Sequence, residues 1–193
     1  LAIYACARRN EEHKDGRETA DLCVSRRKKR LQGMVFSCFI AFLLLVLLFP
    51  QKKSFEIDFL DVGQGDGIYL CTGGGTSMFI DGGSTDVKQV GKYRILPFLK
   101  AKEVSEISYW FVSHTDTDHV SGLKEVLVSG YRVEYLVFAK AVEKEAKTKE
   151  LAELARSHGT KVLYMQAGDT VRSKRAAMRC LYPKAADKAE DVN

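Results

Sequence analysis

The distribution of apolar side chains divides the chain into two parts. From Leu31 to Gln51 no side chain is charged at neutral pH, and residues 34–49 are almost wholly apolar. A helix rises about 1.5 Å per residue, so about 20 apolar residues match the hydrocarbon core of a bilayer. Because the run has no polar stripe, a transmembrane helix over 31–50 is favoured over a buried core helix. A cleavable signal peptide fits less well, because the run lies deep in the chain and no small-x-small cleavage site precedes Ser54.

After residue 53 the pattern is that of short strands interrupted by glycine. Phe55, Ile57 and Phe59 alternate with acidic residues, which predicts a half-buried strand. Glycines 73–75 predict a hairpin, and Gly168-Asp169 a turn between the last two strands. The other predicted strands cover 68–71, 78–81, 107–113, 133–138, 161–165 and 178–182, and the predicted helices cover 97–102, the region of 123–127, and 141–157. Strands followed by alternating helices and strands predict a layered α/β domain over 54–193.

Charge is concentrated before the apolar run. Of the 30 Lys and Arg residues in this 193-residue chain of net charge +5, nine precede Leu31, and only Lys52 and Lys53 follow the run closely. The positive-inside rule therefore predicts a cytoplasmic basic segment at 1–30 and an extracytoplasmic domain after the helix. The globular part is nearly neutral, so bulk charge does not indicate nucleic-acid binding, and no DNA-binding residue is assigned. The basic residues near the end of the chain are explained by a solvated surface better than by a phosphate-binding track.

Candidate metal ligands occur together between His114 and His119. The five cysteines form no Cys-x-x-Cys pair, so metal chemistry would depend on His and Asp. His114, Asp116, Asp118 and His119 fall within six residues, directly after a predicted buried strand. A tight loop entering a helix can direct His114, Asp116 and Asp118 to one side and His119 to a neighbouring position. The loop could thus contribute to two adjacent cation sites, although Asp118 alone could instead be a helix N-cap.

Three further aspartates lie beside glycine turns. Asp61 and Asp66 bracket a glycine turn, and Asp81 precedes two glycines. Hydrogen bonding to the turn backbone and contact with a metal or substrate are alternatives for each of them.

The loop resembles a known signature. His114-x-Asp116-x-Asp118-His119 is similar to the His-x-His-x-Asp-His motif of the metallo-β-lactamase superfamily, with Asp116 in place of the second His. In combination with the sequences at 59–66, 80–83 and 97–99 and the preceding apolar run, it resembles the exported domain of the ComEC competence family, which forms the inner-membrane channel for transforming DNA. The resemblance covers about residues 31–193.

This resemblance implies an αββα sandwich with two divalent cations. His114 and Asp116 would contribute to the first metal site, and Asp118 and His119 to the second. Asp118 would also be the catalytic residue that orients the attacking water. Asp81 would brace the loop from behind, and the residues expected to line the approach are Asp61, Gln64 and Asp66.

The implied reaction is hydrolysis of DNA phosphodiesters. An aspartate in place of an imidazole makes the site harder, which favours manganese or magnesium over zinc and phosphodiesters over β-lactams. The expected substrate is DNA, single-stranded during uptake, and the expected partners are the membrane and other components of the competence machinery. A domain that guides DNA without chemistry and a membrane-tethered hydrolase of small molecules are alternatives.

The resemblance is incomplete at its C-terminal end. The superfamily's later bridging Asp and further His residues have no match here, because Gly168-Asp169 is predicted to be a hairpin turn and His158 ends a charged helix. The chain is therefore interpreted as an internal fragment that holds the first half of the sandwich and is inactive by itself.

Overall fold

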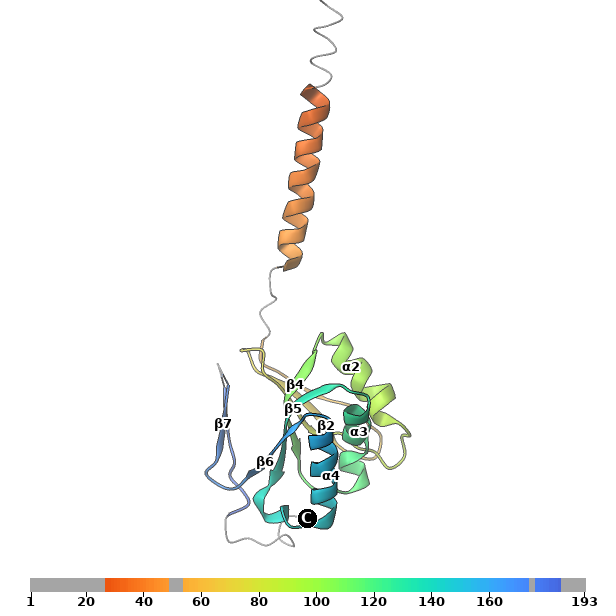
Figure 1. Cartoon of the computed structure of the whole chain (residues 1–193), viewed down its shortest axis with the longest axis vertical. Coiled ribbons are helices and arrows are strands. Elements are labelled where there is room, and N and C mark those ends of the chain that lie inside the picture. Colours follow the sequence, from red (N-terminus) through yellow and green to blue (C-terminus); the bar gives the residue numbers. More distant parts are fainter. Residues whose placement is uncertain (1–26, 49–53, 174–175, 185–193) are drawn as a thin grey trace, which may run out of the picture. The chain divides into compact units, whose positions relative to one another are not determined.

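The computed structural model of the chain describes residues 27–48, 54–173 and 176–184 (Figure 1). The chain divides between Gln51 and Lys52 into two compact units. The first contributes one helix, and the second is a mixed α/β domain, which confirms the α/β class predicted from the sequence.

The helix of the first unit spans Arg27–Leu48, 22 residues with exposed side chains. At about 1.5 Å per residue it is about 33 Å long. Among the described residues it is the one helix long and apolar enough to cross a membrane, a test that a signal sequence also passes. Its described part includes Arg27 to Arg30, so it takes in part of the predicted basic segment. Residues 1–26 and 49–50 of the predicted segments lie outside the described residues.

A six-stranded sheet with the order β1-β2-β3-β4-β5-β6 forms the centre of the second unit. The first three strands are an antiparallel meander, and β4, β5 and β6 continue the sheet in parallel with β3. The strands are β1 (Glu56–Phe59), β2 (Gly67–Cys71), β3 (Ser77–Asp81), β4 (Glu106–Val112), β5 (Arg132–Ala139) and β6 (Lys161–Met165). All six lie where the sequence pattern predicts a strand.

Three helices cover one face of this sheet (Figure 1). They are α2 (Leu96–Ala101), which continues from a π-helical turn at Gly91–Ile95, α3 (Thr117–Val128) and α4 (Ala146–Ser157). Pro97 lies in the first turn of α2, directly after the π-helical turn. Trp110, Leu123 and Leu136 are fully buried between sheet and helices, and this apolar layer is the core that fixes the strand ends.

The helix predicted over 141–157 is shorter in the structure. A 3₁₀ turn at Lys140–Val142 comes first, and α4 begins only at Ala146. Glu145 has extended backbone angles, and its N–H donates to the Val142 carbonyl at 3.0 Å. Because Val142 is buried in the core, the chain must turn tightly before the helix can start.

The end of the described chain also differs from the prediction. A short strand that was not predicted, β7 (Thr170–Arg172), pairs with β8 (Ala177–Arg179) in a separate antiparallel ribbon. The turn at Gly168-Asp169 therefore leads into β7 and not directly into the strand predicted over 178–182. The backbone N–H of Cys180 donates to the Asp169 carbonyl at 2.8 Å, which extends the ribbon by one pair. Cys71 and Cys180 are free thiols.

Strand β1 has the predicted two-residue period but buries the opposite set of side chains. Ile57 and Phe59 are 46% and 79% exposed, whereas Glu56 and Asp58 are only partly exposed. The two carboxylates pair with the ammonium of Lys102, which is 3.0 Å from Asp58 Oδ2. Lys102 is the C-cap residue of α2. Because its ammonium compensates the two carboxylates, the charged side of the strand can face the helical layer.

The inverted burial of β1 predicts that replacing two phenylalanines by alanine lowers the free energy of unfolding by unequal amounts. Phe79→Ala removes a ring that is fully buried and stacked 4.4 Å from Trp110, and should lower the free energy of unfolding by about 3–5 kcal/mol. Phe59→Ala removes an exposed ring and should change it by about 0.5 kcal/mol or less. Urea unfolding followed by far-ultraviolet circular dichroism measures both values. Equal losses would show that the outer side of β1 is covered in solution.

Candidate metal centre

The candidate site lies at the carboxyl ends of two neighbouring parallel strands. Residue Ile80 of β3 is paired with Phe111 of β4, so the next residues of both strands reach the same edge of the sheet. Asp81 ends β3, and Ser113 is the first residue after β4. The loop that follows Ser113 then enters α3 at Thr117, as the sequence analysis expects for a loop held on a rigid strand.

Asp81 connects these elements through a buried carboxylate that is 4% exposed. Its Oδ1 accepts the Ser113 N–H at 2.8 Å, and its Oδ2 accepts the Ser113 hydroxyl at 2.8 Å. His119 Nδ1 lies 3.1 Å from the same Oδ2. The main-chain carbonyl of Asp81 accepts the indole N–H of Trp110 at 2.6 Å. One side chain therefore holds the beginning of the loop and the start of α3 together.

The two histidines of the loop lie against each other. Their ring centroids are 3.6 Å apart with an interplanar angle of 47°. His119 is 9% exposed, and His114 Nδ1 lies 3.1 Å from the Ser113 hydroxyl. The hydroxyl already donates to Asp81, so it accepts from His114. Both rings thus carry the proton on Nδ1, which leaves each Nε2 lone pair available to a cation.

Carboxylates complete two groups of donors around His119. The first comprises His114, Asp118 and His119, and the second comprises Asp66, Asp81 and His119, with the ligand atoms of each group within 4.8 Å of one another. Asp118 Oδ2 is 3.4 Å from His119 Nε2, and Asp66 Oδ2 is 3.8 Å from His119 Nδ1. Imidazole nitrogens with carboxylate oxygens suit zinc or manganese. With its Nδ1 proton held by Asp81, His119 serves the first group through Nε2, so the two groups are alternatives at His119. In the first group Asp81 is the outer contact that metal-bound histidines characteristically have.

Asp116 is placed differently from its neighbours in the loop. It is the N-cap residue of α3, while Asp118, the residue for which an N-cap role was the alternative, lies in the first helical turn. The Asp116 carboxylate accepts from Lys147 at 2.8 Å, and this hydrogen bond holds the pKa of Asp116 below its ordinary value. The same contact raises the pKa of Lys147. Within the described residues, the two donor groups do not include Asp116.

Asp61 and Gln64 belong to the glycine turn and have partners of their own. The Asp61 carboxylate accepts from Arg94 at 2.7 Å, which lowers the pKa of Asp61. The backbone N–H of Gln64 donates to Asp86 Oδ1 at 2.7 Å, and this bond is the largest cause of the lowered pKa of Asp86. Of the three residues expected to line the approach, Asp66 is the one that the structure places in a donor group.

Glycines allow the turn to approach α3. A Cβ on Gly83 would lie 2.4 Å from the backbone of Asp118 and His119, and one on Gly65 would lie 2.5 Å from the Asp118 carbonyl oxygen. The Asp66 N–H donates to that same carbonyl at 3.4 Å, and the Gly83 N–H donates to the Asp66 carbonyl at 3.3 Å. The first turn of α3 therefore packs directly against the backbone at Gly65 and Gly83, where there is no side chain.

Sequence reasoning did not identify Ser113, Arg94 or Lys147. Ser113 directly precedes His114, and a hydroxyl between a strand and a ligand loop was a usable signal. Arg94 and Lys147 lie 33 and 31 residues from their aspartate partners, so only the fold brings them together.

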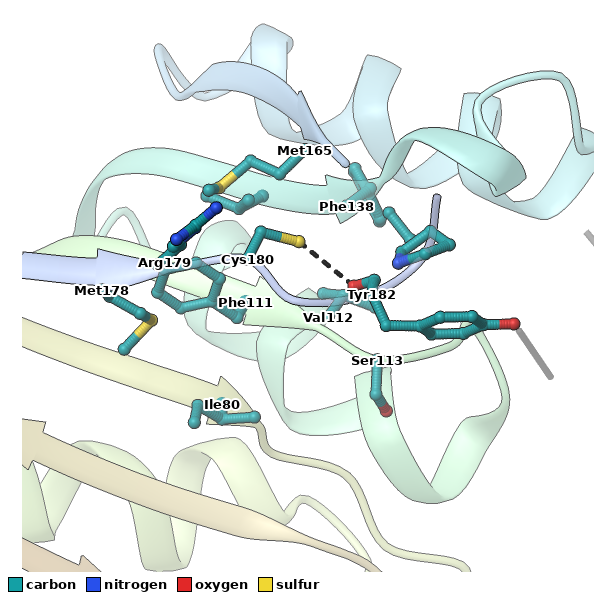
Figure 2. Close-up of a pocket in the computed structure, with 13 residues that line it drawn as sticks. Ile80, Phe111, Val112, Ser113, Phe138, Met165, Met178, Arg179, Cys180 and Tyr182 are labelled. Atoms are coloured by element: carbon teal, nitrogen blue, oxygen red, sulfur yellow. Dashed lines mark hydrogen bonds between the residues drawn. The ribbon is translucent and has the colours of Figure 1, made fainter. Parts of the chain in front are cut away.

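An apolar pocket of about 340 Å³ adjoins the site on the other face of the sheet (Figure 2). Its walls come from Phe111, Val137 and Met165 on the sheet and from Met178 and Tyr182 after β7. The Cys180 thiol donates to the Tyr182 carbonyl at 3.1 Å, which shapes this wall. Ser113 also lines the pocket, so the same residue joins it to the donor groups.

The chain is similar to bacterial proteins named for the ComE operon and for recombination. No family model matches the chain. It is 28% identical over 169 residues to ComE operon protein 3 of Bacillus subtilis (strain 168), an alignment that covers 81% of this chain and 22% of that protein. It is also 30% identical over 106 residues to Recombination protein 2 of Haemophilus influenzae, covering 54% of this chain and 13% of that protein. The chain thus spans about a fifth or less of the length of these relatives.

The close approach of Gly83 to α3 predicts that a side chain at this position weakens metal binding. Gly83→Ala should separate the turn from α3 and weaken Mn²⁺ binding at least about ten-fold, because the added Cβ meets backbone that cannot rotate away. Gly75→Ala is the matched control, since its Cβ meets open space and the cost is confined to its positive φ. Calorimetric titration of both variants measures the affinities. Unchanged Mn²⁺ binding by Gly83→Ala would contradict the packing described.

The Asp61–Arg94 pair predicts a displaced titration. The carboxyl of Asp61 should titrate below 3.8, and Arg94→Met should raise its midpoint toward that value. Because the folded-state pKa is depressed, the contribution of the pair to stability is present above about pH 4 and declines as the pH falls through the folded-state pKa. Carbon-detected NMR of the carboxyl group measures the midpoint. Equal midpoints in the two proteins would argue against the pair.

Proposed function

We propose that the second unit is a metal-dependent phosphodiesterase that cleaves DNA during its uptake, as part of a ComEC-type protein. The observation that carries this proposal is the convergence of His114, Asp118 and His119 at one edge of the sheet, with His119 supported by the buried Asp81. Similarity to proteins named for a competence operon and for recombination supports the DNA-uptake role. The whole fold is proposed to be a metallo-β-lactamase αββα sandwich, of which the described sheet and its helical layer are the first half.

The residues divide into cation ligands and supporting groups. His114, Asp116, Asp118 and His119 would hold two divalent cations, for which manganese or zinc is proposed and magnesium is an alternative. Divalent cations at such a site polarise a phosphoryl oxygen and lower the pKa of water toward neutrality. Asp81 keeps the His119 proton on Nδ1. Asp118, partly exposed beside His119, would orient the attacking water and accept its proton.

The proposed location is the cell membrane. The helix Arg27–Leu48 would span it, with its basic end in the cytoplasm and the α/β domain on the outer side. This topology would place the catalytic edge where incoming DNA arrives, next to other components of the uptake machinery.

A paired measurement of metal binding and cleavage tests the proposal. The 193-residue chain in detergent should bind Mn²⁺, and Asp118→Asn should weaken that binding at least about ten-fold, since a charged ligand is lost. Cleavage of single-stranded DNA is measured on the natural polypeptide that contains this chain, because the family resemblance implies further ligands. Asp118→Asn should lower that rate by about 100-fold or more.

Glu153→Gln is the matched control, because it removes one exposed negative charge on α4 and should leave binding and cleavage unchanged. Equal cleavage by the wild type and Asp118→Asn would refute the catalytic assignment. Retained DNA binding without any cleavage would identify a guiding domain instead, and cleavage of small esters but not of DNA would identify a small-molecule hydrolase.

A further inference from the structure

The ion pair between Lys147 and Asp116 connects the candidate ligand loop to the next crossover helix. Parallel pairing of β4 and β5 brings the segments after Val112 and after Ala139 to the same edge of the sheet. Lys147 in the first turn of α4 therefore reaches Asp116, and its Nζ lies 2.8 Å from Asp116 Oδ1. The two side chains are 69% and 60% exposed, so the pair lies on the rim of the site and faces solvent.

Helix energetics alone do not account for a lysine at this position. The first turn of a helix carries a partial positive charge, which disfavours a cation there. In α4 that turn, all of it described, contains no acidic residue, and the N-cap Glu145 makes no capping hydrogen bond with its side chain. The anion with the largest effect on Lys147 is Asp116, with a smaller contribution from Glu145; Asp116 belongs to another element and stands between two candidate ligands in the sequence.

We propose that Lys147 and a divalent cation compete for the carboxylate of Asp116, so that cation binding releases the Lys147 ammonium to bind a phosphate of the substrate. The inference rests on the proposed function, which it deepens by naming the residue that recognises the anionic substrate.

The Lys147–Asp116 ion pair is weak enough for a divalent cation to displace the lysine. An exposed ion pair changes an equilibrium by about five-fold at most, because water screens both charges. The binding free energy of a divalent cation held by two imidazoles and a second carboxylate is larger than the free energy of such an ion pair. Once released, the ammonium offers three donors and a compact charge at the rim of the ligand loop, which suits the non-bridging oxygens of a phosphodiester.

A double-mutant cycle on the full 193-residue chain tests the competition. Mn²⁺ is titrated calorimetrically into the wild type, Lys147→Met, Asp116→Asn and the double variant. Lys147→Met should bind Mn²⁺ about two- to five-fold more tightly, because the competitor is gone. Asp116→Asn should bind it more weakly, and Lys147→Met should have no further effect on that background. Lys149→Met, which removes an exposed cation from the same helix, is the control and should match the wild type.

A second titration tests the release of the ammonium. With Mn²⁺ saturating, a thymidine dinucleotide phosphorothioate, which resists cleavage, should bind Lys147→Met about three- to ten-fold more weakly than the wild type. Lys147→Arg should retain the affinity. The uncharged methylphosphonate analogue should bind all of these proteins equally, because it carries no charge for the ammonium to recognise.

The outcomes separate the inference from the proposed function. Unchanged or weaker Mn²⁺ binding by Lys147→Met, in a wild type that binds Mn²⁺, overturns the competition alone. Equal dinucleotide binding by the wild type and Lys147→Met overturns the role in substrate recognition. A wild type that binds no Mn²⁺ overturns the proposed function and this inference with it.

Discussion

The need to satisfy one buried carboxylate organises the candidate site. Asp81 is nearly inaccessible, and a charge in that position is tolerable only with donors around it. The donors are the backbone and hydroxyl of Ser113 and the imidazole of His119, so β3, the ligand loop and α3 are fixed relative to one another. Asp81 also has a φ of 56°, in the left-handed region, where aspartate is among the few residues tolerated without glycine. Losing its partners would leave both a buried charge and a strained backbone.

Much of the fold follows from local patterns. Apolar runs bounded by glycine predicted all six strands of the sheet, and helical spacing predicted the three helices on it, because these signals come from neighbouring residues. The inverted burial of β1 could not be predicted in this way. Alternation gives the period of a strand but not its orientation, and here Lys102, far along the chain, determines which side faces inward. The late start of α4 similarly depends on the burial of Val142, which is a tertiary effect.

The candidate site also contains features that the sequence predicts and features that depend on the fold. His114, Asp118 and His119 are close in sequence as well as in space, so their grouping was accessible to motif reasoning. The position of Asp116 was not, because its partner Lys147 arrives through a crossover connection. The glycines between the turn and α3 were recognised as turn residues only. Their second role, to let two backbones touch, depends on distances that no spacing rule contains.

The single tryptophan of the chain occupies a favourable place for observation. Trp110 is fully buried, stacks on Phe79, and gives its indole proton to the main chain of the residue that steadies His119. Indole emission depends on the polarity and hydrogen bonding around the ring, so the protein contains an intrinsic fluorophore directly behind its ligand loop. Any event that loosens this edge of the sheet should shift the emission spectrum without an added label.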